Sequence, residues 1–535
     1  MSVKDSRSLS GLAGLAKSGS ISRRSFMEAT LASGLTAAAA TTLWGREVAA
    51  ATPQRGGTLR AAFDDGSTTD QMDPHTTSSQ FMIQLNHATR NYLTEITEDN
   101  VVGPDIASHW DSSPDAKTWT FTLRKGVEFH NGKPFTASDA AASLNYHRGE
   151  ESKSAAKSLV DQIERIEVDG PHNLVIELKV GNADLPYVMA DYHLVMMPSD
   201  GEGQVDKSGI GTGAYIVDAF EPGVRAHMKR NPNYFKPGRG HFDAVEMLAI
   251  RDVVARQAAI TTGDVDVIAS PELKTLHVLS RDPLIEIDEV ASGTHCTMPM
   301  FVDSAPFDDP DLRLALKYGI DREAIVAKIL HGHGVPGNDH PIGPTLPYWA
   351  DLEPRPYDPE RAKHHLKKAG VGKVAVDISA SDAAFPGAVD MCILYKEQLA
   401  DTGIDLNVVR EPTDGYWSNV WLAKPFCVAQ WGARPTPDVI FSLAYAAEAA
   451  WNESRYKGER FNALMAEARA QLDDIKRAEL YREMQQILRD EGGTIVPFFQ
   501  NRVYARRSNL RHSGKLTANF PLDGARAAER WWFAR

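Results

Sequence analysis

Several early segments of the chain alternate apolar and polar residues with a period of two, which is typical of half-buried β-strands. Thr118–Arg124 is the clearest case, because aromatic and aliphatic residues occupy every second position. Ile163–Val168 and Leu174–Leu178 repeat the pattern on either side of a turn-forming segment, which predicts a hairpin. With Thr58–Phe63, these segments predict that the first part of the chain is rich in sheet.

From about residue 309 onward, the apolar residues follow the longer period of helices. Asp309 and Asp358 each precede a proline, and an N-cap followed by proline at the first helical position marks a helix start. The predicted helices are 310–320, 322–330, 359–369, 388–402 and 475–491. Strands are predicted between them at 374–378, 404–409 and 426–431, so helices and strands alternate as in an α/β lobe.

The C-terminal segments 494–499 and 503–505 return to strand character. We therefore expect the chain to cross from a first lobe to a second lobe near Val290–Val302 and to return near Pro497. Two crossings of this kind make a hinge.

The N-terminus has the order of features of a signal peptide. Paired arginines, Arg23 and Arg24, precede a weakly apolar run, 29–44, and then a segment of small residues ending at Ala50 and Ala51. This order predicts a twin-arginine signal peptide over residues 1–51, cleaved after Ala50 or Ala51, and a periplasmic mature protein. The alternative is a flexible basic N-terminus on a cytoplasmic protein.

Composition narrows the class of partner. The 535 residues are 42% hydrophobic and 24% charged, which suits a globular protein of two or three lobes. Residues 1–51 carry six Lys/Arg and three Asp/Glu, so the remainder has a formal net charge of −16. Such an acidic body argues against nucleic acid or an anionic membrane surface as the main partner. No later stretch has the roughly 18 consecutive apolar residues of a membrane helix, so no stable membrane insertion is expected.

The segment Trp119–Asp139, WTFTLRKGVEFHNGKPFTASD, resembles the most recognisable stretch of the extracytoplasmic solute-binding protein family 5. This family comprises the oligopeptide-, dipeptide-, nickel- and opine-binding components of ABC importers. The resemblance runs from about Gly56 through the rest of the chain. Supporting segments occur in the order typical of the family: Asp73-Pro74-His75, Gly211–Tyr215, Arg230–Tyr234, Pro306–Asp309 and Tyr357–Ala362.

The resemblance implies an α/β, two-lobed periplasmic-binding-protein fold of type II, with an extra mixed β subdomain in lobe I and a ligand cleft between the lobes. We expect lobe I at 52–295, with the subdomain at about 96–200, lobe II at 296–495 and a return to lobe I at 496–535. The implied partners are a small-molecule or short-peptide ligand and the transmembrane permease of an ABC importer. The protein is expected to be a monomer without catalysis. From the residues themselves, Trp119–Asp139 is predicted to pack a sheet and cap a helix.

No organised catalytic or phosphate-binding motif is present, so no cofactor is expected. His331-Gly332-His333, with His340 and His364-His365 further along, is the best metal candidate. Its glycines favour a flexible loop with solvated histidines. The cysteines Cys296, Cys392 and Cys427 have no metal-ligand spacing, and buried free thiols are favoured over one disulfide. An exported hydrolase or metalloenzyme and a chaperone-like peptide holder stay open as alternatives.

Ligand choice is expected to depend on Arg434. In peptide-binding relatives, the position three residues after the equivalent of Trp431 is commonly an aspartate that pairs with the peptide amino terminus. A guanidinium would repel an ammonium group there, and it suits a carboxylate or phosphate instead. We therefore expect a ligand with an acidic group, although Arg434 pairing with an internal carboxylate such as Asp438 is an equal alternative.

Further ligand contacts are expected from aromatic residues and from one loop. Trp417, Trp431 and Tyr445 are candidates for flat apolar walls, with core packing as the competing account. Asp438 is expected to cap the helix that follows. In the loop after the first strand, Ser67 and Thr68 offer hydroxyl and backbone N–H groups from lobe I, unless the loop is merely exposed.

Overall fold

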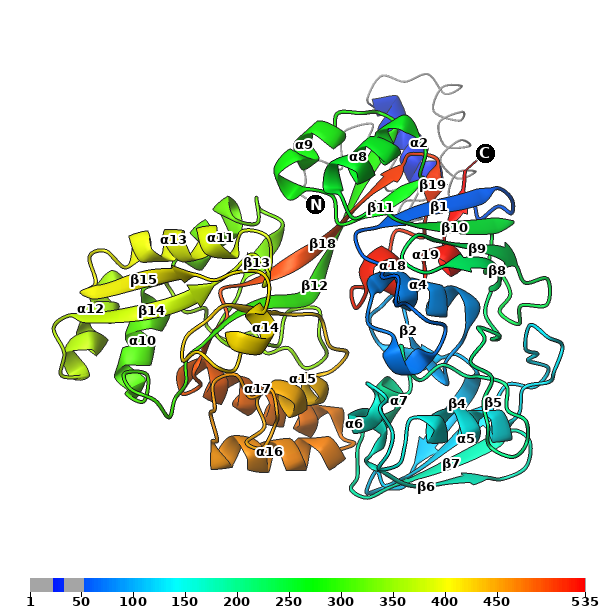
Figure 1. Ribbon diagram of the computed structural model, residues 1–535, viewed down its shortest axis with the longest axis horizontal. Helices are drawn as coiled ribbons and strands as arrows, with labels where there is room; N and C mark the ends of the chain where they lie inside the picture. Colours follow the sequence, from blue (N-terminus) through cyan, green and yellow to red (C-terminus); the bar gives the residue numbers. More distant parts are fainter. Residues whose placement is uncertain (1–22, 33–51, 535) are drawn as a thin grey trace.

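The computed structural model describes residues 23–32 and 52–534. Two strands, β12 (Ile285–Pro299) and β18 (Phe498–Arg507), pair antiparallel and run between the two lobes of the molecule (Figure 1). Their register shifts within residues 290–294, where a bulge interrupts the ladder. The lobes are therefore joined by paired strands.

Lobe I is built on the large sheet that contains β12 and β18. Its strands lie in the order β16-β12-β18-β11-β1-β10-β9-β8. At the centre, β1 (Thr58–Phe63) pairs parallel with β10 (Ala244–Ala249) and β11 (Val267–Ala269), while the other pairings along this order are antiparallel. Leu59, Ala61 and Phe63 of β1 are buried because they face the core of this lobe.

The remaining elements of lobe I, among them the sheet strands β8 and β9, lie between and after the strands named above along the chain. They are η2 (Pro74–Thr76), α4 (Gln80–Thr89), β2 (Thr94–Ile96), β3 (Val102–Pro104), β8 (Tyr215–Glu221), β9 (Arg225–Arg230), α8 (Val253–Thr262), η3 (Leu273–Thr275), α9 (Leu276–Leu279), β19 (Leu510–Arg511), α18 (Pro521–Ala525), α19 (Ala527–Arg530) and β20 (Trp532–Phe533). A further helix near the N-terminus, α2 (Arg23–Ala32), begins at the paired arginines, whereas Ala51 lies outside the described residues.

A separate four-stranded sheet with its own hydrophobic core is inserted in lobe I (Figure 1). Thr136 and Asp139 form a reciprocal capping box at the start of its helix α5, as predicted. All three strand pairings are antiparallel, whereas the family resemblance led us to expect a mixed sheet. The elements are β4 (Ala107–Ser112), β5 (Thr118–Leu123), α5 (Ala137–Tyr146), α6 (Lys157–Val160), β6 (Ile163–Val168), β7 (Asn173–Leu178) and α7 (Leu185–Val188).

Lobe II combines a short parallel sheet with two groups of helices (Figure 1). Its elements are α10 (Pro310–Tyr318), α11 (Arg322–Lys328), β13 (Gly334–Pro336), α12 (Pro359–Lys368), β14 (Val374–Ala380), α13 (Ala388–Gln398), β15 (Ile404–Arg410), α14 (Tyr416–Asn419), β16 (Ala429–Trp431), α15 (Pro437–Ala444), α16 (Glu459–Ala470), α17 (Asp474–Asp490) and β17 (Thr494–Ile495). The strand predicted at 426–431 is shorter than expected, because only its last three residues join the large sheet.

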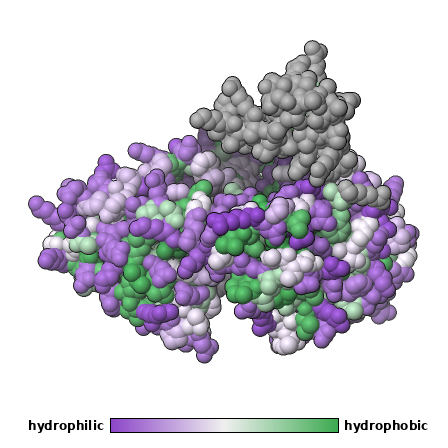
Figure 2. Space-filling model, turned by 90° about the horizontal axis from the view of Figure 1, so that it is seen from above, coloured by the Kyte–Doolittle hydropathy of each residue, from purple (hydrophilic) through white to green (hydrophobic). Residues whose placement is uncertain are grey.

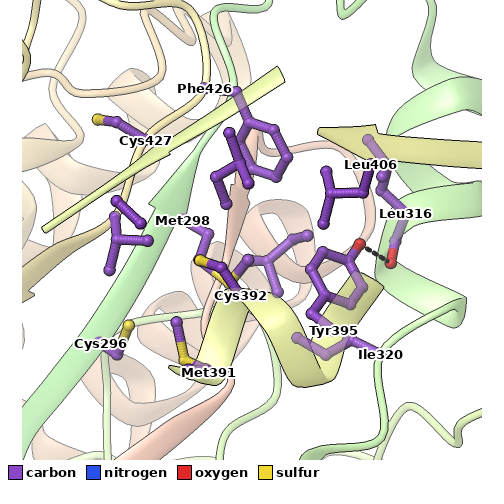
Figure 3. Packing of buried hydrophobic residues seen from close by; sticks show 14 of the residues in the cluster. Cys296, Met298, Leu316, Ile320, Met391, Cys392, Tyr395, Leu406, Phe426 and Cys427 are labelled. Atoms are coloured by element: carbon purple, nitrogen blue, oxygen red, sulfur yellow. Dashed lines mark hydrogen bonds between the residues drawn. The ribbon is translucent and has the colours of Figure 1, made fainter. Parts of the chain in front are cut away.

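The core of lobe II is apolar and contains the three cysteines as buried free thiols (Figure 3). Within it, the Tyr395 hydroxyl donates a hydrogen bond to the Leu316 carbonyl at 2.8 Å, so the one polar group of that ring is satisfied. The favoured prediction of free thiols is confirmed. Among the described residues, no helix has the length and apolar character needed to span a membrane.

Candidate ligand-binding site

The segment that follows β16 carries Arg434 to the boundary between the lobes. β16 pairs with β12 through His295 and Trp431, which fixes the end of the strand beside the hinge. The guanidinium of Arg434 lies 5.7 Å from the centre of the Trp431 ring, and its Nη1 donates to the carbonyls of Gly432 (3.2 Å) and Ala433 (3.3 Å). These contacts hold the side chain against its own loop.

The other edge of the Arg434 guanidinium is free. Within residues 23–32 and 52–534, no acceptor binds its Nε or Nη2, and no carboxylate forms an ion pair with it. Nε and Nη2 together form the side-on fork that binds a carboxylate with two parallel hydrogen bonds. The Nε/Nη2 edge of Arg434 therefore has the geometry that suits a carboxylate.

Asp438 is not the partner of Arg434, so the alternative in which these two residues pair is wrong. The Asp438 carboxylate is buried and accepts from Arg469 Nε at 3.0 Å. It is also not the helix cap, because Thr436 is the N-cap residue of α15 and Asp438 lies in the first turn. Burial raises the pKa of Asp438, with Arg469 opposing the shift. The structure places this residue in an internal ion pair.

Arg434 lies within electrostatic reach of Asp191 and Tyr192 of lobe I. Burial lowers the pKa of Arg434, and the electrostatic influence of Tyr192 and Asp191 opposes the shift. Asp191 already has a partner, because its Oδ1 lies 2.7 Å from Nδ1 of His193. Burial raises the pKa of Asp191, but His193 first and Arg434 to a lesser degree bring it below its ordinary value. Arg434 of lobe II thus interacts electrostatically with residues of lobe I.

Two small cavities share Arg434. One of about 170 Å³ lies in lobe II and is lined by Trp417, Trp421, Ala429, Gln430, Trp431, Gly432, Arg434, Trp451 and Glu453. The other, of about 20 Å³, lies between the lobes and is lined by Ile96, Asn100, Gly293, Thr345, Leu346, Ala433, Arg434, Pro435, Ala518 and Asn519. In the space-filling view, the outline of the molecule is notched between the two lobes (Figure 2).

The structure brings only some of the candidate residues together at these cavities. Trp417 and Trp431 line the larger one with Arg434. Tyr445 is 4% exposed and packs in a core cluster with Trp431, and it lines neither cavity. Ser67 and Thr68 also line neither. Their loop packs against the turn at Gly223, where an added Cβ would lie 2.7 Å from the Ser67 carbonyl carbon.

Sequence reasoning missed Glu453 and Trp451, which line the same cavity as Trp431. They follow α15, twenty or more residues after Trp431 along the chain. The available signal was the density of tryptophans between residues 417 and 451.

A much larger cavity, of about 910 Å³, lies elsewhere, between the inserted sheet and α17. Its lining includes Val101, Trp349 and Ile475, which are 47%, 41% and 75% exposed. Such exposure marks an open surface trough. At Arg434, by contrast, a free guanidinium edge and several tryptophans converge, a combination typical of specific small-molecule sites.

The histidines proposed as metal candidates do not form a cluster. No group of three or more His, Cys, Asp or Glu side chains arranged to hold a metal ion occurs in the described part of the chain. His333 instead lies 3.1 Å from Glu289, His365 lies 2.8 Å from Asp311, and His340 is buried.

Comparison with known proteins identifies the family. The bacterial extracellular solute-binding proteins, family 5 Middle, match residues 101–453, which is more than half of the chain. The chain belongs to this family. Family 5 proteins are substrate-binding receptors that act outside the cytoplasm, and this chain is such a receptor. The di/tripeptide-binding protein 1 of Pseudomonas aeruginosa is 24% identical over 462 residues, covering 80% of this chain and 86% of the relative.

Solved structures show the same two-lobed fold as this family 5 chain. The periplasmic binding protein DppA of Helicobacter pylori, in complex with the peptide STSA, aligns with a TM-score of 0.74 at 21% identity, covering 90% of this chain and 99% of that one. AgaA of A. tumefaciens R10, in complex with agropinic acid, aligns with a TM-score of 0.74 at 20% identity and the same coverage. At these identities the match shows the fold alone.

Proposed function

We propose that this receptor binds a peptide-like or opine-like solute through an acidic group held by Arg434 and delivers it to the permease of an ABC importer. The observation that carries the proposal is the unpaired Nε/Nη2 edge of Arg434 at the lobe boundary. Relatives that bind peptides and opine acids support the ligand class.

The proposed mechanism is closure of the lobes around the ligand. A ligand that touches Arg434 on lobe II and residues of lobe I at the same time makes its full set of contacts only in the closed form, so binding shifts the population towards closure. The permease then recognises the closed shape. We further propose that the protein is a monomer, exported by the twin-arginine route and cleaved near Ala51.

The test begins with thermal-shift screening of purified residues 52–535 against opines, sugar acids, peptides and nickel. A ligand that binds the folded state raises the melting temperature by mass action. Calorimetric titration of that ligand then compares wild type with Arg434→Ala and Arg434→Lys. We expect Arg434→Ala to weaken binding on the order of 10- to 100-fold, because charge-assisted hydrogen bonds are lost. Lysine should restore little, because it cannot form the two-pronged contact.

Arg460→Ala is the matched control, because Arg460 is 62% exposed and pairs with Glu483 away from the cavities. Unchanged affinity in Arg434→Ala would contradict the proposal. So would a screen in which cationic peptides alone stabilise the protein.

A further inference from the structure

Four tryptophans surround the 170 Å³ cavity beside Arg434. We call Trp417, Trp421, Trp431 and Trp451 the tryptophan cage. The centre of the Trp421 ring lies 5.8 Å from that of Trp417, 6.3 Å from Trp431 and 5.9 Å from Trp451, and the Trp431 and Trp451 centres are 5.9 Å apart. Four of the ten tryptophans of the chain are therefore gathered at one cavity.

The cage is not filled by its own side chains. Trp417 is 45% exposed and Trp451 is 42% exposed, although large aromatic residues are usually well buried. The cavity is also far larger than the roughly 10–15 Å³ that a single water molecule needs. The exposure of Trp417 and Trp451 and the open volume distinguish this part of the cage from core packing, whereas Trp431 also belongs to a core cluster.

A buried carboxylate lines the same cavity. Glu453 is 3% exposed, its Oε1 accepts from Nε1 of Trp421 at 2.6 Å, and its Oε2 accepts from the Thr297 hydroxyl at 3.0 Å. Both donors are neutral. Among the residues that the structure describes, no Lys, Arg or His forms an ion pair with Glu453. Burial accordingly raises the pKa of Glu453, with the Trp421 hydrogen bond opposing the shift.

Arg434 does not supply the missing cation. Its guanidinium approaches the cage at the Trp431 ring alone, 5.7 Å from the ring centre, and it makes no ion pair with Glu453. The exposed Trp417 and Trp451 side chains and the Glu453 carboxylate thus line a cavity that a cation from outside the chain can enter. Indole faces attract cations through their quadrupole, and a buried carboxylate adds a full opposite charge.

We propose that the tryptophan cage and Glu453 bind an ammonium group of the ligand. This inference rests on the proposed function, because the acidic group of the same ligand occupies Arg434 next to the cage. The solute is then a zwitterion whose ammonium enters the cage and whose carboxylate meets the Nε/Nη2 edge. A carboxylate placed there also offsets the repulsion between the ligand ammonium and Arg434.

Small cations without a carboxylate test the cage alone. Methylammonium chloride and tetramethylammonium chloride are titrated into residues 52–535 at constant ionic strength, with sodium chloride as the reference, and tryptophan fluorescence is followed. We expect a saturable response in the wild type. Tighter binding of methylammonium indicates a primary ammonium that donates to Glu453, and tighter binding of tetramethylammonium indicates a methylated one; both results support the proposal.

Single substitutions test whether the fluorescence response to these cations arises at the cage. Glu453→Gln and Trp451→Ala should each weaken binding at least tenfold, and Trp451 is 42% exposed, so its variant is expected to keep the fold. Trp349→Ala is the matched control, because Trp349 is 41% exposed but lines the distant trough. No saturable response in the wild type would overturn the proposal, as would an equal loss in Trp349→Ala.

Arg434→Ala separates the two proposals. If both proposals hold, Arg434→Ala loses binding of the acidic ligand but keeps the cation response. The reason is that the substitution removes a positive charge that repels the cation. A wild type that binds an acidic ligand through Arg434 but gives no cation response would refute the cage and leave the receptor proposal intact. The opposite result is a cation response that is lost in Glu453→Gln, together with an affinity for acidic ligands that is the same in Arg434→Ala and wild type. It would support the cage and refute the role of Arg434.

Discussion

At the scale of single residues, the buried carboxylate of Glu453, proposed to bind the ligand, lowers the stability of the folded protein when it is ionised. A carboxylate surrounded by neutral donors is costly to ionise, because nothing nearby compensates the buried charge. The raised pKa of Glu453 means that, between its ordinary value of 4.5 and the higher folded value, the folded state holds more protons than the unfolded state. The stabilising effect of the proton is therefore complete below pH 4.5 and is lost as pH rises through the folded value.

The direction of this pH dependence predicts how Glu453→Gln changes the thermal stability of the ligand-free protein. At pH 7 the variant should unfold at a higher temperature than the wild type, since the neutral amide avoids the buried charge and can still accept from Trp421. The difference should shrink below pH 4.5, where both side chains are neutral. Calorimetric melting of the two proteins from pH 4 to pH 8 measures this. The prediction would be contradicted if the melting temperature of the variant minus that of wild type were lower at pH 7 than at pH 4.

At the scale of elements, α7 and α17 connect the lobes on the side opposite the hinge. Nη2 of Arg477 in α17 lies 2.8 Å from Oδ1 of Asp184, the N-cap residue of α7, and both side chains are at most 5% exposed. The contact is a buried ion pair. Next to it, the Ala183 N–H donates to the Arg469 carbonyl at 2.8 Å. These contacts exist only while the lobes are together.

Removing the charge of Asp184 should therefore favour the open form. In the closed form, Asp184→Asn leaves the Arg477 guanidinium buried without a counter-ion, whereas opening returns it to water. Small-angle X-ray scattering of the ligand-free variant should give a larger radius of gyration than wild type. The control is Asp161→Asn, which removes an exposed pair with Lys157 inside the inserted sheet's own subdomain. Identical scattering for wild type and Asp184→Asn would show that this pair does not influence closure.

The same scale shows what the sequence could predict. The bounds of β1 and β6 agree with the predicted ranges residue for residue, and α12 begins behind its Asp358 cap as expected. These elements depend on local periodicity and capping, which a single sequence contains. The start of α15 was misjudged, because Thr436 and Asp438 are both good caps and only the backbone decides between them.

The candidate site was predictable only in part. Arg434 and Trp431 were found because they lie in one short segment that the family resemblance aligns. The tryptophan cage draws instead on α14, the end of β16 and the loop after α15, and Thr297 of β12 adds a donor to Glu453. No local pattern relates these segments, because they meet only when lobe II folds.

At the scale of the whole molecule, the free cysteines bear on the route of export. Cys296, Cys392 and Cys427 lie in the core of lobe II, and burial raises the pKa of each thiol well above its ordinary value. The reactive thiolate form is thereby suppressed. A chain threaded unfolded into an oxidising compartment would expose these thiols to disulfide formation before its core closed. A chain that folds before export would keep them protected.

The proposed twin-arginine leader offers that protection, because this route carries folded proteins. Replacing Arg23 and Arg24 together by lysine keeps the positive charge but removes the paired guanidinium groups. We expect the double variant to accumulate in the cytoplasm as the uncleaved, folded chain, while wild type is found in the periplasm after cleavage near Ala51. Cell fractionation with immunoblotting measures this, and replacing the nearby Lys17 by arginine is the control. Undiminished export of the double variant would mean that the chain leaves by another route, and the buried thiols would then require protection from elsewhere.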